Sequence, residues 1–111
     1  MNIQIIGTKK CKDTQKAIRF FKERNVAFHL VDLNERALSK GEFEKISSKL
    51  DEDELINRNS QFYKNKGYDY LEYDVYEEVF EHQELLITPV IRNGNEICSG
   101  NKPDVWKGWL T

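Results

Sequence analysis

The chain has 111 residues, of which 39% are hydrophobic and 32% charged, and its formal net charge is -2. This length allows one domain with one modest core, and two prolines with six glycines leave no room for a linker or a low-complexity tract. A net charge this close to zero gives no indication of direct nucleic-acid binding, which normally shows as a basic surface. No apolar run approaches the roughly 18 residues that span a membrane, so we expect no membrane segment.

The cysteines indicate the compartment. Residues 2–6 already form a strand pattern, so we expect no signal peptide. Cys11 and Cys98 lie far apart in the sequence and do not make a disulfide framework. We therefore expect a cytoplasmic, reducing setting, in which a cysteine is more often catalytic or inert than structural.

The N-terminal third predicts a strand, a helix and a second strand. Apolar residues at 2–6 indicate a buried strand, 13–24 has the spacing of an amphipathic helix, and Asn25 is a plausible helix stop before a strand at 26–31. This order implies two parallel strands with a right-handed crossover. Ligands of such units bind beyond the carboxyl ends of the strands, where Cys11 lies.

The middle of the chain, about residues 38–84, predicts a block of helices. The predicted helix starts are the capping boxes at 39–42 and 74–77, the acidic stretch 51–54, and Asn59 or Ser60 before a helix that ends at Gly67. The side chains expected to face inward are Phe43, Ile46, Leu50, Val75, Val79 and Phe80. The block contains no strand pattern and is predicted to be a helical insert.

The C-terminal part predicts a hairpin and a closing helix. The apolar run 85–92 indicates a strand, Asn93 and Gly94 form the two-residue turn, and 95–98 returns as the partner strand. The segment 103–110 predicts a helix that buries Val105, Trp106, Trp109 and Leu110. The whole order is β-α-β, helical insert, β-β-α. We therefore predict one α/β domain over residues 1–111, with a thioredoxin-like fold and a mixed four-stranded sheet.

Cys11 is the strongest candidate for chemistry. It is predicted to lie where the first helix begins, and the free amides and the dipole of a helix start stabilise a thiolate. Lys9, Lys10 and Lys12 place three cations nearby. These conditions lower the pKa of a thiol, so we predict that Cys11 is a reactive thiolate. The alternative is a partly buried cysteine beside solvated lysines.

The chain resembles the arsenate reductase (ArsC)/Spx-like proteins of the thioredoxin superfamily. The features that carry the resemblance are Cys11 followed by Lys16 and Ala17, the stretch 55–58, Leu85 and Leu86 leading to Pro89, and Gly100 before the last helix. The resemblance implies that the Cys11 thiolate attacks a disulfide or an oxyanion. It also implies that no cofactor is bound and that an external thiol, of the glutathione or thioredoxin type, resolves the adduct as co-substrate.

The resemblance also assigns roles to substrate-binding residues. Arg58 would bind the oxyanion, since a guanidinium donates two hydrogen bonds to one anion. Lys10 and Lys12 would contribute point charges. Arsenate-reducing members have arginines where this chain has Thr88 and Asn101. The dipeptide Thr88–Pro89 instead resembles the cis-proline segment that binds thiol substrates in glutaredoxins, which favours disulfide or glutathione chemistry.

Several alternatives remain open at this point. Cys98 is either a small buried side chain or a resolving thiol, and Arg58 could instead pair with Asp51, Asp53 or Glu54. Thr14 stands where a second redox cysteine would be in Spx-like members, and it could tune the cysteine sulfur. The missing second cysteine counts against a disulfide switch but not against docking. A regulator or adaptor that docks on a protein partner such as RNA polymerase, without turnover, is the second functional hypothesis. The two histidines have no ligand neighbours, so we predict no metal site.

Overall fold

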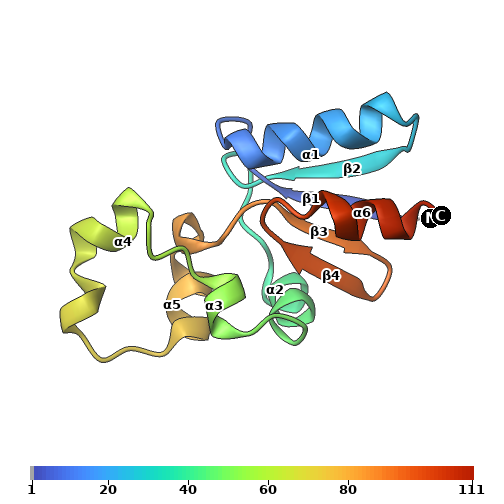
Figure 1. The fold of residues 1–111 in the computed structure, drawn as a ribbon. Helices are drawn as coiled ribbons and strands as arrows, with labels where there is room; N and C mark the ends of the chain where they lie inside the picture. The colour runs from blue at the N-terminus through green and yellow to red at the C-terminus, as the bar shows by residue number, and fades with distance from the viewer. Residues whose placement is uncertain (1) are drawn as a thin grey trace. The chain divides into compact units, whose positions relative to one another are not determined.

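The sheet combines parallel and antiparallel strands. A computed structural model describes residues 2–111, and its sheet has the strand order β2-β1-β3-β4 (Figure 1). The strands are β1 (Ile3–Gly7), β2 (Phe28–Asp32), β3 (Val90–Asn93) and β4 (Glu96–Ser99). β1 pairs in parallel with β2 and antiparallel with β3, and β3 and β4 form an antiparallel hairpin. The predicted α/β class and mixed four-stranded sheet are confirmed.

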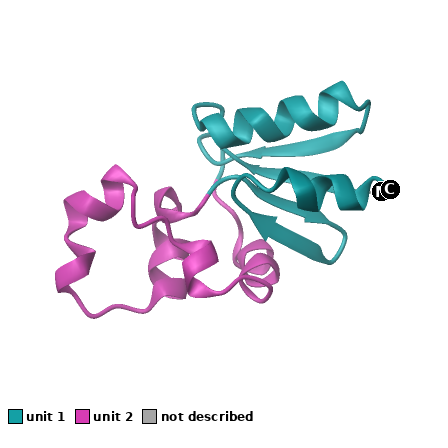
Figure 2. Ribbon diagram, viewed as in Figure 1, with its two compact units in different colours: residues 1–36, 88–111 teal, residues 37–87 magenta. Residues whose placement is uncertain are grey.

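The chain divides into two compact units, shown in Figure 2. The sheet unit comprises residues 1–36 and 88–111, and the helical unit comprises residues 37–87. The helical unit corresponds to the predicted insert at about 38–84. That the whole of 1–111 behaves as one domain stays a prediction.

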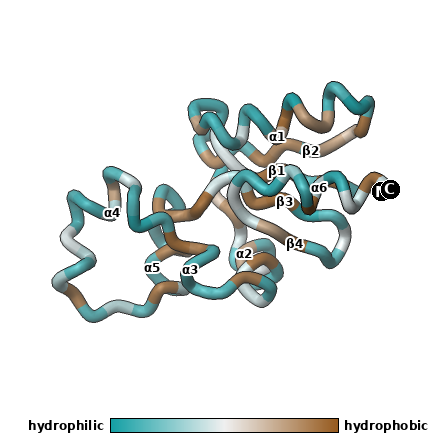
Figure 3. Tube along the Cα trace, in the orientation of Figure 1, coloured by the Kyte–Doolittle hydropathy of each residue, from teal (hydrophilic) through white to brown (hydrophobic). Residues whose placement is uncertain are grey.

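The core of the sheet unit lies between one sheet face and two helices, α1 (Lys12–Glu23) and α6 (Pro103–Trp109). Side chains alternate along a strand, so Ile3 and Ile5 point to the same face, where they meet Phe21 and Trp106. The Phe20 ring lies 5.0 Å from that of Phe21 and 5.3 Å from that of Trp106, in edge-to-face contacts. Figure 3 shows the hydrophobic stretch along β1 that supplies this core.

Three expectations for the sheet unit are wrong in detail. The predicted strand at 85–92 starts only at Val90, because Pro89 has no N–H for a ladder hydrogen bond. Asn93 pairs with Glu96, so the two-residue turn is Gly94–Asn95 and not Asn93–Gly94. Gly94 takes the left-handed position of this turn (φ 61°), which glycine adopts at no steric cost. Of the four side chains that the last helix was predicted to bury, α6 buries Trp106, whereas Trp109 and Leu110 are half-buried and Val105 is 41% exposed.

The C-terminal end of α1 is as predicted. Asn25 has a φ of 57°, the left-handed conformation that ends many helices.

The helical unit contains α2 (Lys40–Ser47), α3 (Glu52–Leu55), α4 (Gln61–Lys66) and α5 (Val75–Glu81), with short 3-10 turns at Tyr68–Tyr70 and Gln83–Leu85. Ser39 and Asp51 each form a complete capping box, and Ser60 and Asp74 each accept a hydrogen bond from the backbone three residues on. The predicted helix starts are therefore confirmed, because capping is a local interaction.

The predicted inward side chains of the helical unit are buried, except that Phe80 is half-buried. An isolated antiparallel bridge joins Ile56 to Leu86, and both are buried. The Tyr68 hydroxyl donates to Glu78 at 2.8 Å, and burial together with this bond raises the pKa of Tyr68 to about 12. Within residues 2–111, no helix is long and apolar enough to cross a membrane.

Candidate active site

Cys11 lies at the start of α1, just beyond the carboxyl end of β1. Its amide donates to the carbonyl of Thr8 (3.1 Å), which closes the turn after the strand, and its carbonyl accepts from the amide of Gln15 (3.0 Å). Cys11 is the N-cap residue of the helix, in extended conformation, and its side chain forms no cap hydrogen bond. The predicted strand–turn–helix at the cysteine is confirmed, and the half-buried sulfur is left to interact with other groups.

Thr88 brings a second segment to the sulfur. Its hydroxyl donates to Cys11 Sγ at 3.1 Å, and the thiol can in turn donate to the Thr88 carbonyl at 3.6 Å. These residues are 77 positions apart in the sequence. The expected cis peptide between Thr88 and Pro89 is present, and the carbonyl of Pro89 accepts from the amide of Gly100 (2.8 Å). The loop before β3 is thus tied to the end of β4, with Thr88 against the sulfur.

The surroundings of Cys11 favour the thiolate. Burial raises the pKa of the thiol, but the hydroxyl donors of Thr14 and Thr88 and the nearby backbone amides of Thr14 and Asp13 stabilise the charged sulfur, outweigh burial and leave the pKa below its ordinary value. These backbone amides belong to the first turn of α1, where N–H groups have no partner within the helix. Lys9, Lys10 and Lys12 are exposed, and their predicted contacts with substrate stay predictions.

Thr14 is more important to this site than its sequence position indicated. Its side chain is fully buried, and a Cβ at Gly7 would overlap its hydroxyl, so glycine at the end of β1 makes room for it. The Thr14 hydroxyl forms no hydrogen bond within residues 2–111 as the structure describes them, yet it lies close enough to the sulfur to lower the pKa of Cys11. We interpret it as a donor that engages the sulfur when the sulfur carries charge. The sequence signal was its spacing, since residues three apart are neighbours on a helix.

Replacing Thr88 with valine should raise the pKa of Cys11, because the thiolate loses a hydroxyl donor. Less thiolate would then be present near neutral pH, so we expect the rate of iodoacetamide alkylation at pH 7 to fall several-fold and its pH midpoint to move upward. Mass spectrometry of the alkylated Cys11 peptide across a pH series measures this.

The matched variants are Thr88→Ser, which keeps a hydroxyl and should stay close to wild type, and Thr8→Val. Thr8 contacts Cys11 through its backbone carbonyl, which the valine substitution leaves in place. An unchanged midpoint in Thr88→Val would contradict the role of this hydroxyl.

Arg58 belongs to the helical unit, where it forms an ion pair. Its Nη1 donates to Asp53 Oδ1 at 2.7 Å, and this hydrogen bond raises the pKa of Arg58. The structure thus selects Asp53 from the three acidic partners that the sequence left open. The Arg58 side chain is 42% exposed and that of Asp53 is 84% exposed, and exposed ion pairs contribute little to stability, so Arg58 can exchange this partner at small cost. Its oxyanion-binding role stays a prediction.

Cys98 occupies a different environment. It lies on β4 opposite Ile91 and packs, partly buried, against the core between the sheet and the helices. Neither cysteine is in a disulfide. This placement suits the interpretation as a small apolar side chain, and a role as resolving thiol stays a prediction. Within the described residues 2–111, no cluster of three or more His, Cys, Asp or Glu side chains could hold a metal ion.

Comparisons with known proteins establish the fold. No protein-family model matches the sequence, and no curated protein matches it either. Among solved structures, a protein named YFFB superposes with a TM-score of 0.87 at 18% identity, covering 98% of this chain and 99% of that chain. An arsenate reductase from Vibrio cholerae superposes with a TM-score of 0.79 at 16% identity, covering 95% and 94%.

A glutaredoxin from Archaeoglobus fulgidus superposes with a TM-score of 0.51 at 13% identity, covering 97% of this chain and 84% of that chain. At these identities the likeness concerns the fold alone. The fold of the chain is similar to those of ArsC-type arsenate reductases and of a glutaredoxin.

Proposed function

We propose that this protein is a thiol-dependent oxidoreductase in which the Cys11 thiolate attacks a disulfide or an oxyanion and an external thiol releases the product. The observation that carries the proposal is the environment of the sulfur. Cys11 Sγ lies at the start of α1, accepts a hydrogen bond from Thr88 at 3.1 Å, and has a lowered pKa. A half-buried thiolate held by donors is the nucleophile that thiol exchange requires.

With a disulfide substrate, the reaction has two exchanges. The Cys11 thiolate attacks one sulfur of the substrate, the S–S bond breaks, and the other sulfur leaves as a thiolate that takes a proton from solvent. An external thiolate then attacks the substrate-derived sulfur of the mixed disulfide, and Cys11 leaves as a thiolate. The part of the substrate that left in the first exchange is now a reduced thiol, and the external thiol is oxidised to a disulfide with the other part. Thr14 and Thr88 would stabilise Cys11 each time it leaves as a thiolate.

A disulfide is the better substrate candidate than arsenate. Thr88 and Asn101 hold positions at which the resemblance expects arginines, and the Thr88 hydroxyl is directed at the Cys11 sulfur. Asn101 is exposed and carries no charge. Each missing charged hydrogen bond would contribute about 1.5–3 kcal/mol to holding an oxyanion. The reducing cytoplasm, with its supply of small thiols, is the compartment that this chemistry needs.

Asn101→Arg should raise arsenate turnover by about ten-fold or more if the missing guanidinium limits oxyanion binding. This variant keeps Thr88. The double variant Thr88→Arg with Asn101→Arg adds a second guanidinium but loses the hydroxyl at the sulfur. Arsenate-dependent oxidation of glutathione measures the effect, with Asn101→Gln as the uncharged control. No gain in either arginine variant would count against this explanation of substrate preference.

The direct test of function supplies the wild-type protein with a glutathione mixed disulfide or with arsenate, and with reduced glutathione as the external thiol. We expect turnover with the disulfide. If Cys11 is alkylated readily at neutral pH but neither substrate turns over, the oxidoreductase proposal fails. A regulator or adaptor of the Spx-like kind, with Cys11 as a sensor, would then be the better explanation.

A further inference from the structure

The sheet face that points away from α1 and α6 changes from apolar to polar along the strands. Strand side chains alternate between faces, so the even-numbered residues of β1 lie opposite the core residues Ile3 and Ile5. Strand pairing groups them into two cross-strand rows, Val31–Ile6–Val90 and His29–Gln4–Arg92. The first row is apolar and no more than 2% exposed, while the second is polar and at least half-buried at its centre. This face of the sheet therefore changes from fully apolar to fully polar between two adjacent rows, which lie two residues apart along β1.

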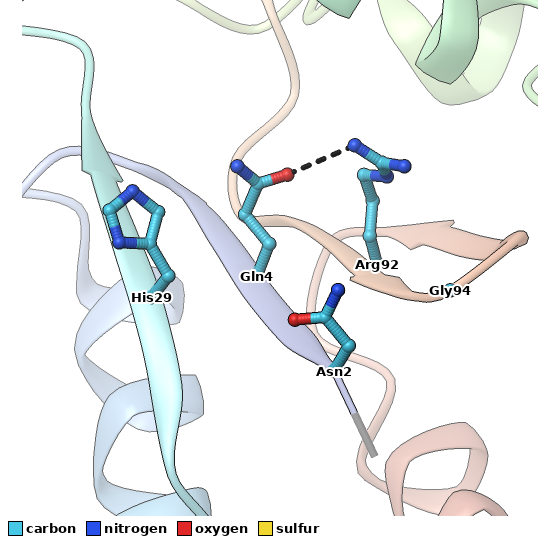
Figure 4. Close-up of a pocket in the computed structure, with 5 residues that line it drawn as sticks. All are labelled: Asn2, Gln4, His29, Arg92 and Gly94. Carbon is cyan, nitrogen blue, oxygen red and sulfur yellow. Dashed lines mark hydrogen bonds between the residues drawn. The ribbon is translucent and has the colours of Figure 1, made fainter.

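The polar row lines a depression of about 230 Å³, together with Asn2 and Gly94 (Figure 4). Figure 4 shows His29, Gln4 and Arg92 standing on the same side of the sheet, each from a different strand. Gly94 has no side chain to fill the corner beside Arg92, and a Cβ placed there would meet nothing within 4 Å. The depression is thus open at the hairpin end and polar along its floor.

Arg92 is the cation of this depression. Its Nη1 donates to Gln4 Oε1 at 3.2 Å, which anchors the guanidinium at one nitrogen, and its Nε is buried without a hydrogen-bond partner among the described residues. None of the described residues that line the depression carries a carboxylate, so the charge of Arg92 is not neutralised there. A guanidinium in this condition favours an oxygen anion, to which it can donate two parallel hydrogen bonds.

We propose that this depression binds a small oxyanion, a carboxylate or a phosphate group, with Arg92 as the principal donor. The Gln4 oxygen is occupied by Arg92, which leaves the amide N–H groups of Gln4 as donors, and His29 and Asn2 add donors from either side. The volume suits one small acid or one phosphate group, since drug-sized ligands occupy about 300 Å³ or more.

The depression is separate from the thiol site. It lies where β1 begins, whereas Cys11 follows the other end of the same strand. Strands rise about 3.3 Å per residue, so the length of β1 separates the two sites. The proposal therefore does not rest on the chemistry of Cys11, and its test can fail while the oxidoreductase proposal stands.

The test is a titration of the ¹⁵N-labelled full chain followed by NMR, with sodium phosphate in one arm, sodium acetate in a second and sodium chloride at matched ionic strength in a third. We expect saturable shifts of the amides near Asn2, Gln4, His29, Arg92 and Gly94 in at least one oxyanion arm and none that saturate in chloride. Saturation by phosphate or by acetate alone identifies the group. Shifts that do not saturate, or that fall mainly on the lysines of α1, would overturn the proposal.

Variants locate the binding at Arg92. Arg92→Gln should weaken binding by about ten-fold or more, because one charged bidentate contact is lost. Arg24→Gln, which removes a guanidinium stacked 3.7 Å above the Phe20 ring, should bind as wild type. Equal loss in both variants, or none in Arg92→Gln, would contradict the site. If Arg92→Gln does not fold, His29→Ala decides instead, since His29 is exposed: several-fold weaker binding is expected, and unchanged binding overturns the proposal.

Discussion

Cys11→Ser should reduce turnover of every substrate to the rate measured without protein, while the fold persists. A serine hydroxyl is not ionised near neutral pH and cannot form the mixed disulfide, so the first exchange is lost. The fold should tolerate the change because residue 11 is a half-buried N-cap position, at which serine is a preferred residue. A turnover assay and a thermal unfolding curve of the same preparation measure the two effects separately.

Cys98→Ser is the matched control for this experiment. Cys98 packs against the core of the sheet unit, and an external thiol is proposed to do the resolving, so this variant should retain most of its turnover. A folded Cys98→Ser protein that had lost turnover would identify Cys98 as the resolving thiol and contradict the need for an external one. Residual turnover in Cys11→Ser would remove Cys11 from the mechanism altogether.

Phe21→Ala should lower the free energy of unfolding by about 3–5 kcal/mol, the range found when a buried aromatic ring is truncated. Phe21 is fully buried, and its ring lies 5.0 Å from Phe20 and 5.9 Å from Trp106, so the change opens a cavity between α1, α6 and the sheet. Since the total stability of a domain is about 5–15 kcal/mol, the loss would be a large fraction of it. Urea denaturation followed by circular dichroism measures the effect.

Tyr70→Ala is the comparison for this prediction. Tyr70 is 92% exposed, and substitutions of exposed side chains usually change stability by no more than about 0.5 kcal/mol. A loss below about 1 kcal/mol in Phe21→Ala, close to the value for the exposed site, would mean that Phe21 is not at the centre of the core.

Much of the fold was predictable because many of its determinants are local. Ser39, Asp51 and Ser60 each cap a helix through a backbone amide three residues ahead, and Gly67 ends one in the left-handed conformation. Such interactions can be read from residue types and spacing. The errors came where a neighbouring segment decides the outcome. The hairpin register places the turn at Gly94–Asn95, one residue later than the Asn–Gly pattern indicated.

The same distinction between local and long-range interactions applies to the candidate site. The sequence placed Cys11 at a helix start, since the strand, the turn and the helix pattern are adjacent in the chain. The hydrogen bond from Thr88 was beyond the reach of local pattern, because it joins residues 77 positions apart. The partner of Arg58 was undecided for a related reason. Three carboxylates lie within a few residues of it, and the folded backbone brings Asp53 to the guanidinium.

The sequence by itself therefore determined the order of helices and strands, their caps and the position of Cys11 at a helix start, all of which depend on interactions over a few residues. The tertiary structure alone decided what surrounds the sulfur and which side chains share the open face of the sheet. The reason is physical: a pairing register shifted by one residue would turn every side chain of a strand to the opposite face. Gln4, His29 and Arg92 meet only because three strands pair in the observed register.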